Sequence, residues 1–490
     1  DDEDEEEDEE KEEEPVEIDF DQIYQRLEQV TSLPGNEAHM TVSDDGETFY
    51  FVNNLGSWSA NYNAERDLHK IKWDGTELQA LTEGGQSPSN VRFGPKGTNL
   101  YMMLNGGSIS RYNTDNSSME SLPFKANLTI NHNEEKKQIF QEAWRTLDAG
   151  FYDPDFHGEN WDSLRHKYRP WAMKASTKSD FQDMFNFMLG ELNASHMGLY
   201  SSDRAETQNQ RTGLLGIEIV PVEKGARITH VVPGSPADRE MSTLHTGEII
   251  TEVEGTPVNS VDNFYSLLTA TVNEEIRLLL EDQDGNEREV VIQPTGNLND
   301  ELYQEWVDQR RELTEKYSDG KIGYIHIEGM NWPSFERFER ELVAAGENKD
   351  ALIIDVRYNG GGWTTDYLLT VLNVRQHAYT IPRGAAEDID KEKDRFRNHY
   401  PYGERLPFAQ WTKPVATICN NVSYSNAEIF SHAFKNLDIG PLIGEPTFGA
   451  VISTGGKRLI DGSYVRLPYR GWFVKKTNKN MEHNPAVPDY

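Results

Sequence analysis

The sequence is poor in cysteine and in long apolar runs. Cys419 is the only cysteine among 490 residues, so no disulfide can form within the chain, and the redox compartment stays open. No stretch is apolar over the roughly 20 residues that a membrane-spanning helix needs. The chain opens on acidic residues and not on a basic segment followed by an apolar one, so we expect no signal peptide in it. Cytoplasmic and periplasmic locations are both compatible with this sequence.

Basic residues are also scarce. There are 48 Lys and Arg against 83 Asp and Glu, which gives a net charge of −35. Residues 1–14 hold 13 acids and one lysine, so we predict a disordered acidic tail or linker over residues 1–15. The rest of the chain still carries −23, which repels nucleic acid and anionic membranes. Neither is an expected partner, and solubility is the simplest meaning of the charge.

Two sequence patterns of cofactor chemistry are missing. No His-Glu-x-x-His occurs, and no Gly-Lys-Ser/Thr follows the glycines at residues 360–362. The sequence therefore gives no reason to expect a zinc centre or a nucleotide. We expect a protein without a metal or a cofactor.

Residues 16–125 contain a repeat. Residues 43–52 and 94–103 each form an Asp/Gly turn followed by a strand pattern, and a second strand pattern follows at 67–73 and at 108–112. This spacing favours β-propeller blades, with a small β-sandwich as the alternative. A ring usually takes at least four blades, so we expect the missing blades from a longer precursor or from a second chain. The acidic segment is a candidate cleavage site between such halves.

The pattern then changes to helices over residues 126–210, which we predict to be a helical cap domain. Residues 138–147 and 180–192 have the apolar spacing of helices. The second helix leads into Ser195 and His196. A lone Ser-His pair is a weak signal, and a histidine just past a helix end is more often structural than catalytic.

Residues 211–297 are predicted to form a PDZ-like domain. The residues Gly213, Leu214, Leu215 and Gly216 precede a strand pattern, as in a loop that accepts a peptide C-terminus. The segments 231–237 and 247–255 carry a PDZ signature typical of bacterial proteases. Such a domain binds a chain end by adding a strand to its sheet edge. The alternative is a structural module with a closed groove.

Residues 298–490 are predicted to form an α/β domain. A strand, a helix and a strand follow one another, which favours a mixed or parallel sheet covered by helices. Leu298, Leu302, Trp306 and Leu313 fall on one side of a helix that connects this domain to the preceding one. The expected elements are helices over 298–315, 335–345 and 366–374 and strands over 322–327 and 351–357.

A strand-to-helix turn stands near the end of this domain. The apolar run 414–419 predicts a strand, residues 420–426 a turn, and 428–434 a helix. A serine on such a turn presents its hydroxyl, and the amide after it lies at a helix N-terminus, where negative charge is stabilised. This is the geometry of an acyl-transfer nucleophile. An Asn/Ser-rich capping turn is the plainer alternative.

These motifs together resemble peptidase family S41 and, within it, the tricorn branch, over residues 16–490. The resemblance implies a multidomain α+β protein with partial propeller blades, a helical cap, a PDZ-like domain and a ClpP/crotonase-like α/β catalytic domain. The motifs that carry it are the Pro-Gly-Ser-Pro-Ala segment at 233–237, Asp355–Gly362, Ser423–Ile429 and Gly444–Gly449.

The resemblance also implies a catalytic set. Ser425 corresponds to the nucleophile and His196 to its base, with Ser195 holding the imidazole and Glu482 orienting Ser195. Glu482 matches by its distance to the Pro-Asp pair that follows, although the family usually has Asn and Gly where His483 and Pro485 stand. The backbone amides of Gly361 and Asn426 would form the oxyanion hole, with Gly360 as the replacement for Gly361.

The base distinguishes two branches of the family. In the C-terminal processing peptidases a lysine follows the Gly-Glu-Pro-Thr-Phe-Gly segment, but Ala450 stands there in this chain. A displaced lysine such as Lys457 is the remaining Ser–Lys alternative. The tricorn resemblance implies hydrolysis of peptides or unfolded proteins through an acyl-enzyme, and a hexamer. An inactive PDZ-containing scaffold that binds peptides is the alternative function.

Overall fold

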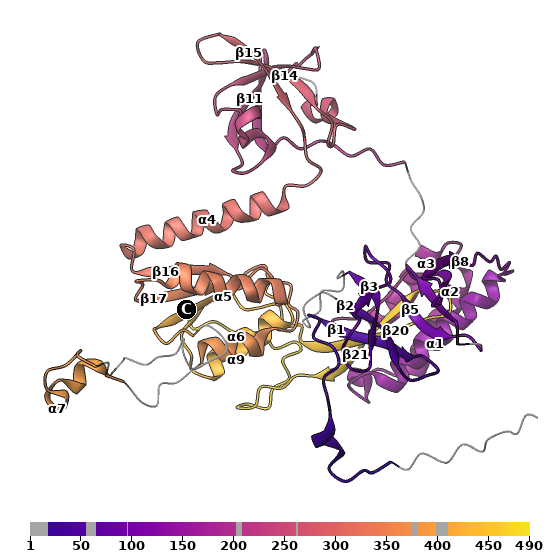
Figure 1. The fold of residues 1–490 in the computed structure, drawn as a ribbon. Helices are drawn as coiled ribbons and strands as arrows, with labels where there is room; N and C mark the ends of the chain where they lie inside the picture. Colours follow the sequence, from indigo (N-terminus) through magenta and orange to yellow (C-terminus); the bar gives the residue numbers. More distant parts are fainter. Residues whose placement is uncertain are drawn as a thin grey trace, which may run out of the picture. The chain divides into compact units, whose positions relative to one another are not determined.

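The computed structural model describes residues 18–54, 65–95, 97–201, 208–260, 263–373, 380–381, 383–397 and 410–490. Its contacts divide the chain into two compact units, Asp1–Thr129 and Ile130–Tyr490 (Figure 1). The acidic segment predicted as a tail, residues 1–15, lies outside the described residues. Within the described ranges, no helix is both long and apolar enough to cross a membrane.

The first unit holds two antiparallel sheets of four strands each, and in both the strands are neighbours in sequence order. The second strand of each sheet follows one of the two repeated Asp/Gly turns, and the third corresponds to the second predicted strand. A short 3-10 helix, Ile23–Arg26, precedes the sheets. The strands are β1 Asn36–Val42, β2 Thr48–Asn54, β3 Arg66–Lys72 and β4 Gln79–Ala80, then β5 Ser89–Phe93, β6 Asn99–Leu104, β7 Ser108–Asn113 and β8 Ser118–Ser121.

The two sheets share one core. Val52 and Leu68 of the first sheet cluster with Leu100 and Met102 of the second. The buried carboxylate of Asp67 accepts hydrogen bonds from the Thr82 hydroxyl and from the amides of Gly85 and Gln86, which open the connection to the second sheet. These bonds fix the passage from one repeat to the next.

Three helices open the second unit: α1 His132–Gly150, α2 Trp161–Lys174 and α3 Lys178–Gly190. The side chains of Asn131, Asn160 and Thr177 accept backbone N–H groups at their N-termini, which is how such residues start helices. The first and third helices confirm the predicted ones. The second was not predicted, because Pro170 and several aromatic residues interrupt its pattern.

A strand from this helical part pairs with a hairpin from the far end of the chain. After α3 comes β9 Gly198–Tyr200, which lies at the edge of the sheet order β20-β21-β9. The hairpin consists of β20 Ile452–Arg458 and β21 Tyr464–Gly471. Its residues Leu459 and Val465 are buried in the same core as Phe140 and Phe185 of the helices. Segments about 260 residues apart are thereby joined in one small sheet.

The PDZ-like segment forms a separate sheet with the strand order β10-β11-β12-β14-β15. Ile228, Ile250 and Leu278 pack in its core. Because β10 stands at one end of this order, the strand after the predicted peptide-binding loop is an edge strand. The strands are β10 Ile217–Val222, β11 Gly225–Val231, β12 Ile249–Val253, β13 Thr256–Pro257, β14 Ile276–Glu281 and β15 Glu287–Ile292.

The predicted connecting helix is present as α4, Asn299–Ser318. Its predicted apolar side is only partly correct, because Leu302 and Leu313 are 48% and 44% exposed. Val307 is its one buried residue, and the Tyr303 hydroxyl bonds to His326 at 2.9 Å. The buried side of α4 is therefore narrower and more polar than the apolar spacing predicts.

The last part is a parallel four-stranded sheet in the order β16-β17-β18-β19. Helices α5, α6 and α9 share one core with it through Phe335, Leu368 and Phe430 (Figure 1). The loops after β17 and β18 leave the same carboxyl edge of the sheet, where ligands bind in such folds. The elements are β16 Ile322–His326, α5 Trp332–Gly346, β17 Ala351–Asp355, α6 Thr365–Leu372, α7 Ile389–Glu392, β18 Val415–Cys419, α9 Asn426–Asn436 and β19 Leu442–Gly444.

Candidate active site

Ser425 lies on the turn between a buried strand and a helix. It follows β18 and is the N-cap of α9, with φ 56° and ψ −116°. Residues other than glycine rarely adopt this backbone conformation, and such strain costs about 1–3 kcal/mol. The turn lifts the hydroxyl away from the strand, as in a nucleophile elbow. Ser423 on the same turn is buried, and its hydroxyl donates to the Val356 carbonyl at 2.8 Å.

A buried carboxylate holds this turn in place. The side chain of Glu428, on the first turn of α9, is 0% exposed and accepts the Ser425 amide at 3.2 Å. It also accepts the amides of Gly449 and Ala450 at 2.5 and 2.9 Å and the Thr447 hydroxyl at 2.8 Å. Burial raises the pKa of Glu428, whereas these four donors favour its ionised form.

His196 reaches Ser425 from the helical part of the chain. It lies two residues before β9, with φ 60°, and its side chain is 7% exposed. Its Nε2 is 2.9 Å from Ser425 Oγ. The β9–β21 pairing joins this segment to the C-terminal part of the chain, and the hydrogen bond to Ser425 places it at the turn after β18. At this distance the imidazole can accept the proton of the Ser425 hydroxyl.

Ser195 and Glu482 continue the hydrogen-bond chain. Ser195 Oγ lies 2.7 Å from His196 Nδ1 and donates to Glu482 Oε2 at 3.0 Å. Glu482 is 2% exposed, and it also accepts the amides of Ser195 and Val451, each at 2.8 Å. The structure therefore brings together all four side chains that the sequence pointed to, in the order serine, histidine, serine, glutamate.

The electrostatics of this chain keep His196 neutral. Burial, and after it the charge of Arg466, lowers the pKa of His196 from 6.5 to about 4. At neutral pH the imidazole is therefore unprotonated, which is the form that a general base needs.

The two predicted oxyanion residues, Asn426 and Gly361, both lie next to Ser425. Asn426 is the first residue of α9, and its side chain is fixed by Thr365, whose amide donates to Asn426 Oδ1 at 3.0 Å. A Cβ on Gly361 (φ 91°) would come within 2.7 Å of Ser425 Cβ. The Gly361 amide, however, donates to Asn359 Oδ1 at 2.8 Å. Gly360, the replacement considered from the sequence, is exposed.

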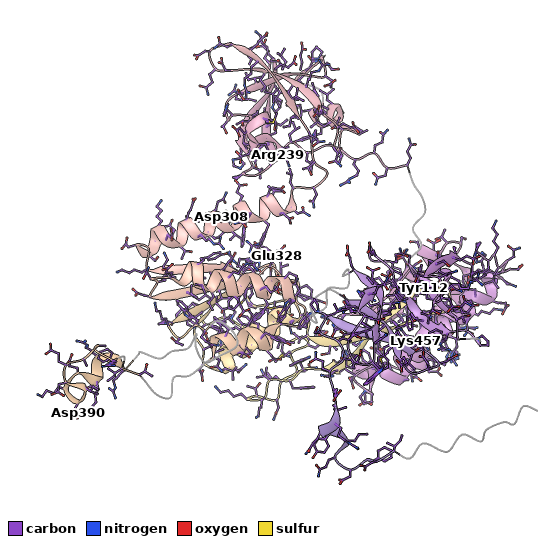
Figure 2. All side chains as sticks on the ribbon, viewed as in Figure 1. Tyr112, Arg239, Asp308, Glu328, Asp390 and Lys457 are labelled. Atoms are coloured by element: carbon purple, nitrogen blue, oxygen red, sulfur yellow. The ribbon has the colours of Figure 1, made fainter. Side chains whose placement is uncertain are left out.

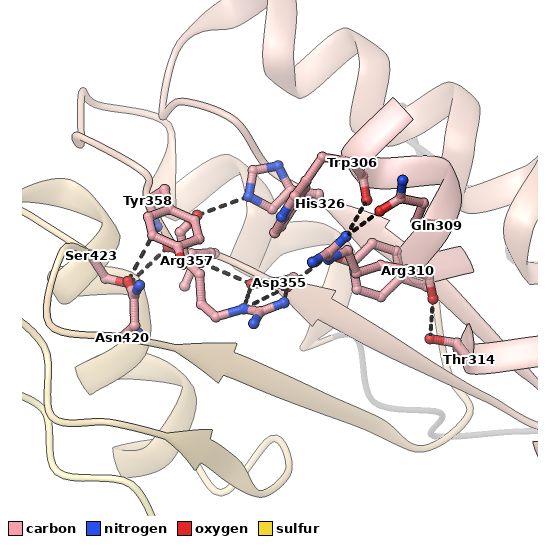
Figure 3. Close-up of polar contacts among 12 residues, drawn as sticks. Trp306, Gln309, Arg310, Thr314, His326, Asp355, Arg357, Tyr358, Asn420 and Ser423 are labelled. Atoms are coloured by element: carbon pink, nitrogen blue, oxygen red, sulfur yellow. Dashed lines mark hydrogen bonds and ion pairs between the residues drawn. The ribbon is translucent and has the colours of Figure 1, made fainter. Parts of the chain in front are cut away.

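A polar network fixes the loop that carries these glycines (Figure 3). The Arg357 guanidinium pairs with the fully buried carboxylate of Asp355, and His326 Nε2 lies 2.8 Å from the Arg357 carbonyl. The Tyr358 amide donates to Asn420 Oδ1 at 3.2 Å, which ties the glycine loop to the turn of the nucleophile. Both loops of the site are thus held by side chains beneath them.

Known proteins similar to this chain cover nearly all of it. It is 24% identical over 483 residues to the tricorn protease of Thermoplasma volcanium, which covers 95% of this chain and 45% of that protein. Tricorn protease homolog 1 of Streptomyces coelicolor is 28% identical over 373 residues, which is 74% of this chain and 33% of the relative. A crystal structure of the tricorn protease has the same fold, with a TM-score of 0.80, 22% identity and coverage of 97% and 46%. The chain spans less than half the length of each.

Three family models match separate parts of the chain. Peptidase family S41 matches residues 321–490, the tricorn protease C1 domain residues 132–190 and the tricorn protease PDZ domain residues 213–297. Residues 321–490 thus belong to peptidase family S41, and residues 132–190 and 213–297 are domains of the tricorn type. The S41 match holds Ser425 and Glu482, whereas Ser195 and His196 lie between the matches to the C1 and PDZ domains. Taken together, the described residues have a mixed α/β fold, with helices and several sheets.

Alanine occupies the position at which the C-terminal processing peptidases have their lysine. Ala450 is buried, and its amide donates to Glu428. The displaced candidate, Lys457, which is labelled in Figure 2, belongs to β20 and is exposed. In the part of the chain that the structure describes, no hydrogen bond joins Lys457 to Ser425, while His196 makes one.

Two backbone amides of the predicted peptide-binding loop already form hydrogen bonds within the PDZ domain. The amides of Gly213 and Leu214 donate to the carbonyls of Leu268 and Thr295. Leu215 is buried, and Gly216 has φ +84° and is packed against Ser235, where a Cβ would fall 2.1 Å from Ser235 Cβ. The amides of Leu215 and Gly216 are therefore the better candidates for a peptide carboxylate.

Two residues of the site were not predicted from the sequence: Tyr424, which contacts His196, and Glu428. The Ser-x-x-Glu spacing from Ser425 to Glu428 is a capping-box pattern and could have indicated Glu428. Among the described residues, no group of three or more His, Cys, Asp or Glu is arranged to hold a metal ion.

Proposed function

We propose that this chain is a serine peptidase that hydrolyses peptide bonds through an acyl-enzyme on Ser425. One observation carries the proposal: the hydroxyl of Ser425 lies 2.9 Å from Nε2 of a buried, neutral His196. An alcohol is a weak nucleophile at neutral pH and becomes reactive when an adjacent base removes its proton.

Acylation follows from the chain of hydrogen bonds. Ser425 Oγ attacks the scissile carbonyl carbon while its proton passes to His196 Nε2. The imidazolium that forms is stabilised through Ser195, whose hydroxyl connects Nδ1 to the carboxylate of Glu482. When the tetrahedral intermediate collapses, the C–N bond breaks and Nε2 returns the proton to the leaving amine.

Deacylation uses the same groups with water in place of the serine. His196 takes a proton from the water, whose oxygen attacks the ester carbonyl of the acylated Ser425. Collapse releases the new carboxylic acid, and the proton returns to Ser425 Oγ. The proton transfers of this step use His196, Ser425 and the attacking water.

The negative oxygen of each tetrahedral intermediate needs hydrogen-bond donors. The amide of Asn426 at the start of α9 is one, because the N-terminus of a helix favours negative charge. Gly361 is the second donor if substrate displaces the Asn359 side chain from its amide, and Gly360 takes this role if it does not. One such donor contributes roughly 3 kcal/mol to transition-state stabilisation.

Peptides or unfolded protein segments are the substrates we propose. The edge strand β10 of the PDZ domain and the loop at residues 213–216 would hold a peptide end by strand addition. An inactive scaffold would use the same groove, but it would have no need of a base next to Ser425.

The assembly is part of the proposal. We take the two four-stranded sheets of the first unit to be two propeller blades, completed by blades of the same precursor or of a second chain. A homo-oligomer, a hexamer by the family resemblance, would then carry the sites. Light scattering would measure its mass against the 56.0 kDa of one chain.

Digestion of a peptide library tests the activity. Cleavage products, identified by mass spectrometry, should form with the natural chain and not with Ser425→Ala. A Ser431→Ala variant is the matched control, since Ser431 lies on α9 and bonds within that helix. Products that form equally with Ser425→Ala, or with none of the proteins, would contradict the proposal.

A further inference from the structure

A tyrosine lies against the base on the side away from the nucleophile. The hydroxyl of Tyr424 is 3.0 Å from His196 Nδ1. The two rings are stacked with centroids 4.7 Å apart and an angle of 19° between their planes. Tyr424 itself is not a member of the proposed Ser-His-Ser-Glu chain.

The position of Tyr424 is fixed by its neighbours. Its amide donates to the Asn359 carbonyl at 2.9 Å, and its ring forms a T-shaped pair with Phe448, with centroids 5.1 Å apart. Because it directly precedes Ser425, the strained turn sets the nucleophile and this ring together. Tyr424 therefore holds the imidazole from the same turn that presents the hydroxyl to be deprotonated.

The protons at Nδ1 can be counted. When His196 acts as a base through Nε2, Nδ1 carries the only ring hydrogen, and Ser195 Oγ at 2.7 Å accepts it. The Ser195 proton goes to Glu482, so this path is complete without Tyr424. The hydroxyl oxygen of Tyr424 can also accept a hydrogen bond from the same Nδ1–H. This hydrogen bond becomes stronger when the imidazole of His196 is protonated.

The stacked ring adds a second effect. A cation over an aromatic face is stabilised, by more when the pair is shielded from water. The ring also covers the imidazole, and burial is the main cause of the lowered pKa of His196. Tyr424 thus acts on both protonation states of the base. The charged or titratable groups that face His196 are Tyr424, Arg466 and, through Ser195, Glu482.

We propose that Tyr424 is a positioning residue for His196, acting on Nδ1 in parallel with Ser195. Its hydroxyl fixes the ring orientation in which Nε2 faces Ser425, and its ring stabilises the imidazolium formed during acyl transfer. The proposal rests on the proposed peptidase function for its kinetic consequences, but the contact itself can be measured without any substrate.

Two substitutions separate the hydroxyl from the ring. In Tyr424→Phe the ring stays, so we expect kcat to fall about fivefold to tenfold, as for loss of one hydrogen bond, with KM and the acid limb of the pH profile unchanged. In Tyr424→Leu both the stacking on the imidazolium and part of its cover are lost. Because burial is the main cause of the lowered pKa of His196, loss of cover outweighs loss of stacking, and the acid limb should move up toward pH 6.5. Tyr317→Phe, at a tyrosine that is 80% exposed on α4, is the matched control.

Combining these variants with Ser195→Ala tests the parallel arrangement. If both hydroxyls bind Nδ1, Ser195→Ala should lower kcat by a larger factor in the Tyr424→Phe variant than in the natural chain. Equal losses in both backgrounds would contradict a shared nitrogen.

Nitrogen NMR of histidine-labelled protein, with His196→Ala for assignment, gives a readout without activity. The Nδ1 signal of His196 should shift in Tyr424→Phe and stay in place in Tyr317→Phe. An unmoved signal would overturn this inference whether or not the chain cleaves peptides. A shifted signal in a protein that shows no hydrolysis would instead overturn the proposed function and leave the contact established.

Discussion

Among single residues, the proposed activity depends most on a histidine that stays neutral. His196 is buried beside the positive charge of Arg466, and both lower its pKa to about 4. An exposed histidine would be half protonated near pH 6.5. In the proposed mechanism the neutral form is the active one, so we expect activity above the pKa and its loss as the pH falls through it.

The acid limb of the pH profile should therefore lie near pH 4 and not near 6.5. The rate at which Ser425 reacts with a fluorophosphonate, measured between pH 3.5 and 8, gives this limb, with circular dichroism to find where the chain stays folded. Arg466→Ala removes one of the two causes and should move the limb upward. A limb at pH 6.5 in the natural chain would contradict a buried base.

Glu428 offers a second prediction at this scale. A glutamine has one acceptor oxygen, so in Glu428→Gln its NH₂ group would face a backbone N–H of the 447–450 segment or of Ser425. We expect a loss of about 2 kcal/mol of stability, the usual cost of a buried donor without a partner, read from the midpoint of urea unfolding.

Labelling of Ser425 should slow in the same variant, because the turn loses its anchor. The exposed Glu445→Gln, three residues before Phe448, is the matched control and should change neither quantity. If Glu428→Gln unfolds and reacts like the natural chain, the carboxylate has no part in holding the nucleophile.

At the scale of elements, the site is the meeting of two loops with a strand from elsewhere in the chain. The loops leave β17 and β18 at one edge of the parallel sheet. Close packing between them needs a glycine, since a Cβ on Gly361 would fall 2.7 Å from Ser425 Cβ and 2.9 Å from the Asn426 amide. Real Cβ contacts are not that short, so one loop would have to move.

Gly361→Ala should therefore abolish labelling of Ser425 while the chain stays folded. The added methyl group pushes the glycine loop away from Ser425, and the positive φ of 91° adds strain. Gly107→Ala, where a Cβ would meet nothing within 4 Å, is the matched control. Normal labelling of Gly361→Ala would show that the two loops are not as close as described.

Local patterns were enough to predict some of these elements. The run before Ser425 predicted β18, and the apolar spacing after it predicted α9, because a period of two or of 3.6 residues is encoded within ten residues. They could not predict the pairing of β9 with β21, since strand pairing across about 260 residues leaves no mark in local periodicity. For this reason the approach of His196 to Ser425 came from a family resemblance and not from spacing.

The role of Tyr424 and the buried side of α4 could not be predicted for a related reason. Tyr424 looked like part of a turn, and only the stacking on His196 gives it a role. On α4 the apolar residues 302 and 313 predicted a buried face, whereas the structure buries Val307 and uses Tyr303 for a hydrogen bond. A helix that lies against one strand buries a narrow stripe, which apolar spacing alone does not locate.

At the scale of the whole molecule, charge is the dominant feature. A net charge of −35 makes the folded chain repel itself, and dissolved ions screen that repulsion over about 10 Å at 0.1 M. We expect the melting temperature to rise by several degrees between 0.05 and 1 M NaCl, measured by differential scanning calorimetry.

The matched comparison for the salt effect is an uncharged osmolyte. Sucrose also favours the compact state but does not screen charge, so salt should act at ionic strengths where equal concentrations of sucrose do little. A melting temperature that falls or stays level as salt is added would contradict the view that self-repulsion limits stability.

In the proposed mechanism His196 activates Ser425. The rate at which a fluorophosphonate labels the protein measures this activation, and mass spectrometry identifies the labelled residue. We predict one adduct, on Ser425, and a loss of more than about a hundredfold in rate in His196→Ala, in line with general base catalysis. No adduct on Ser425, or an equal rate without the imidazole, would contradict the account.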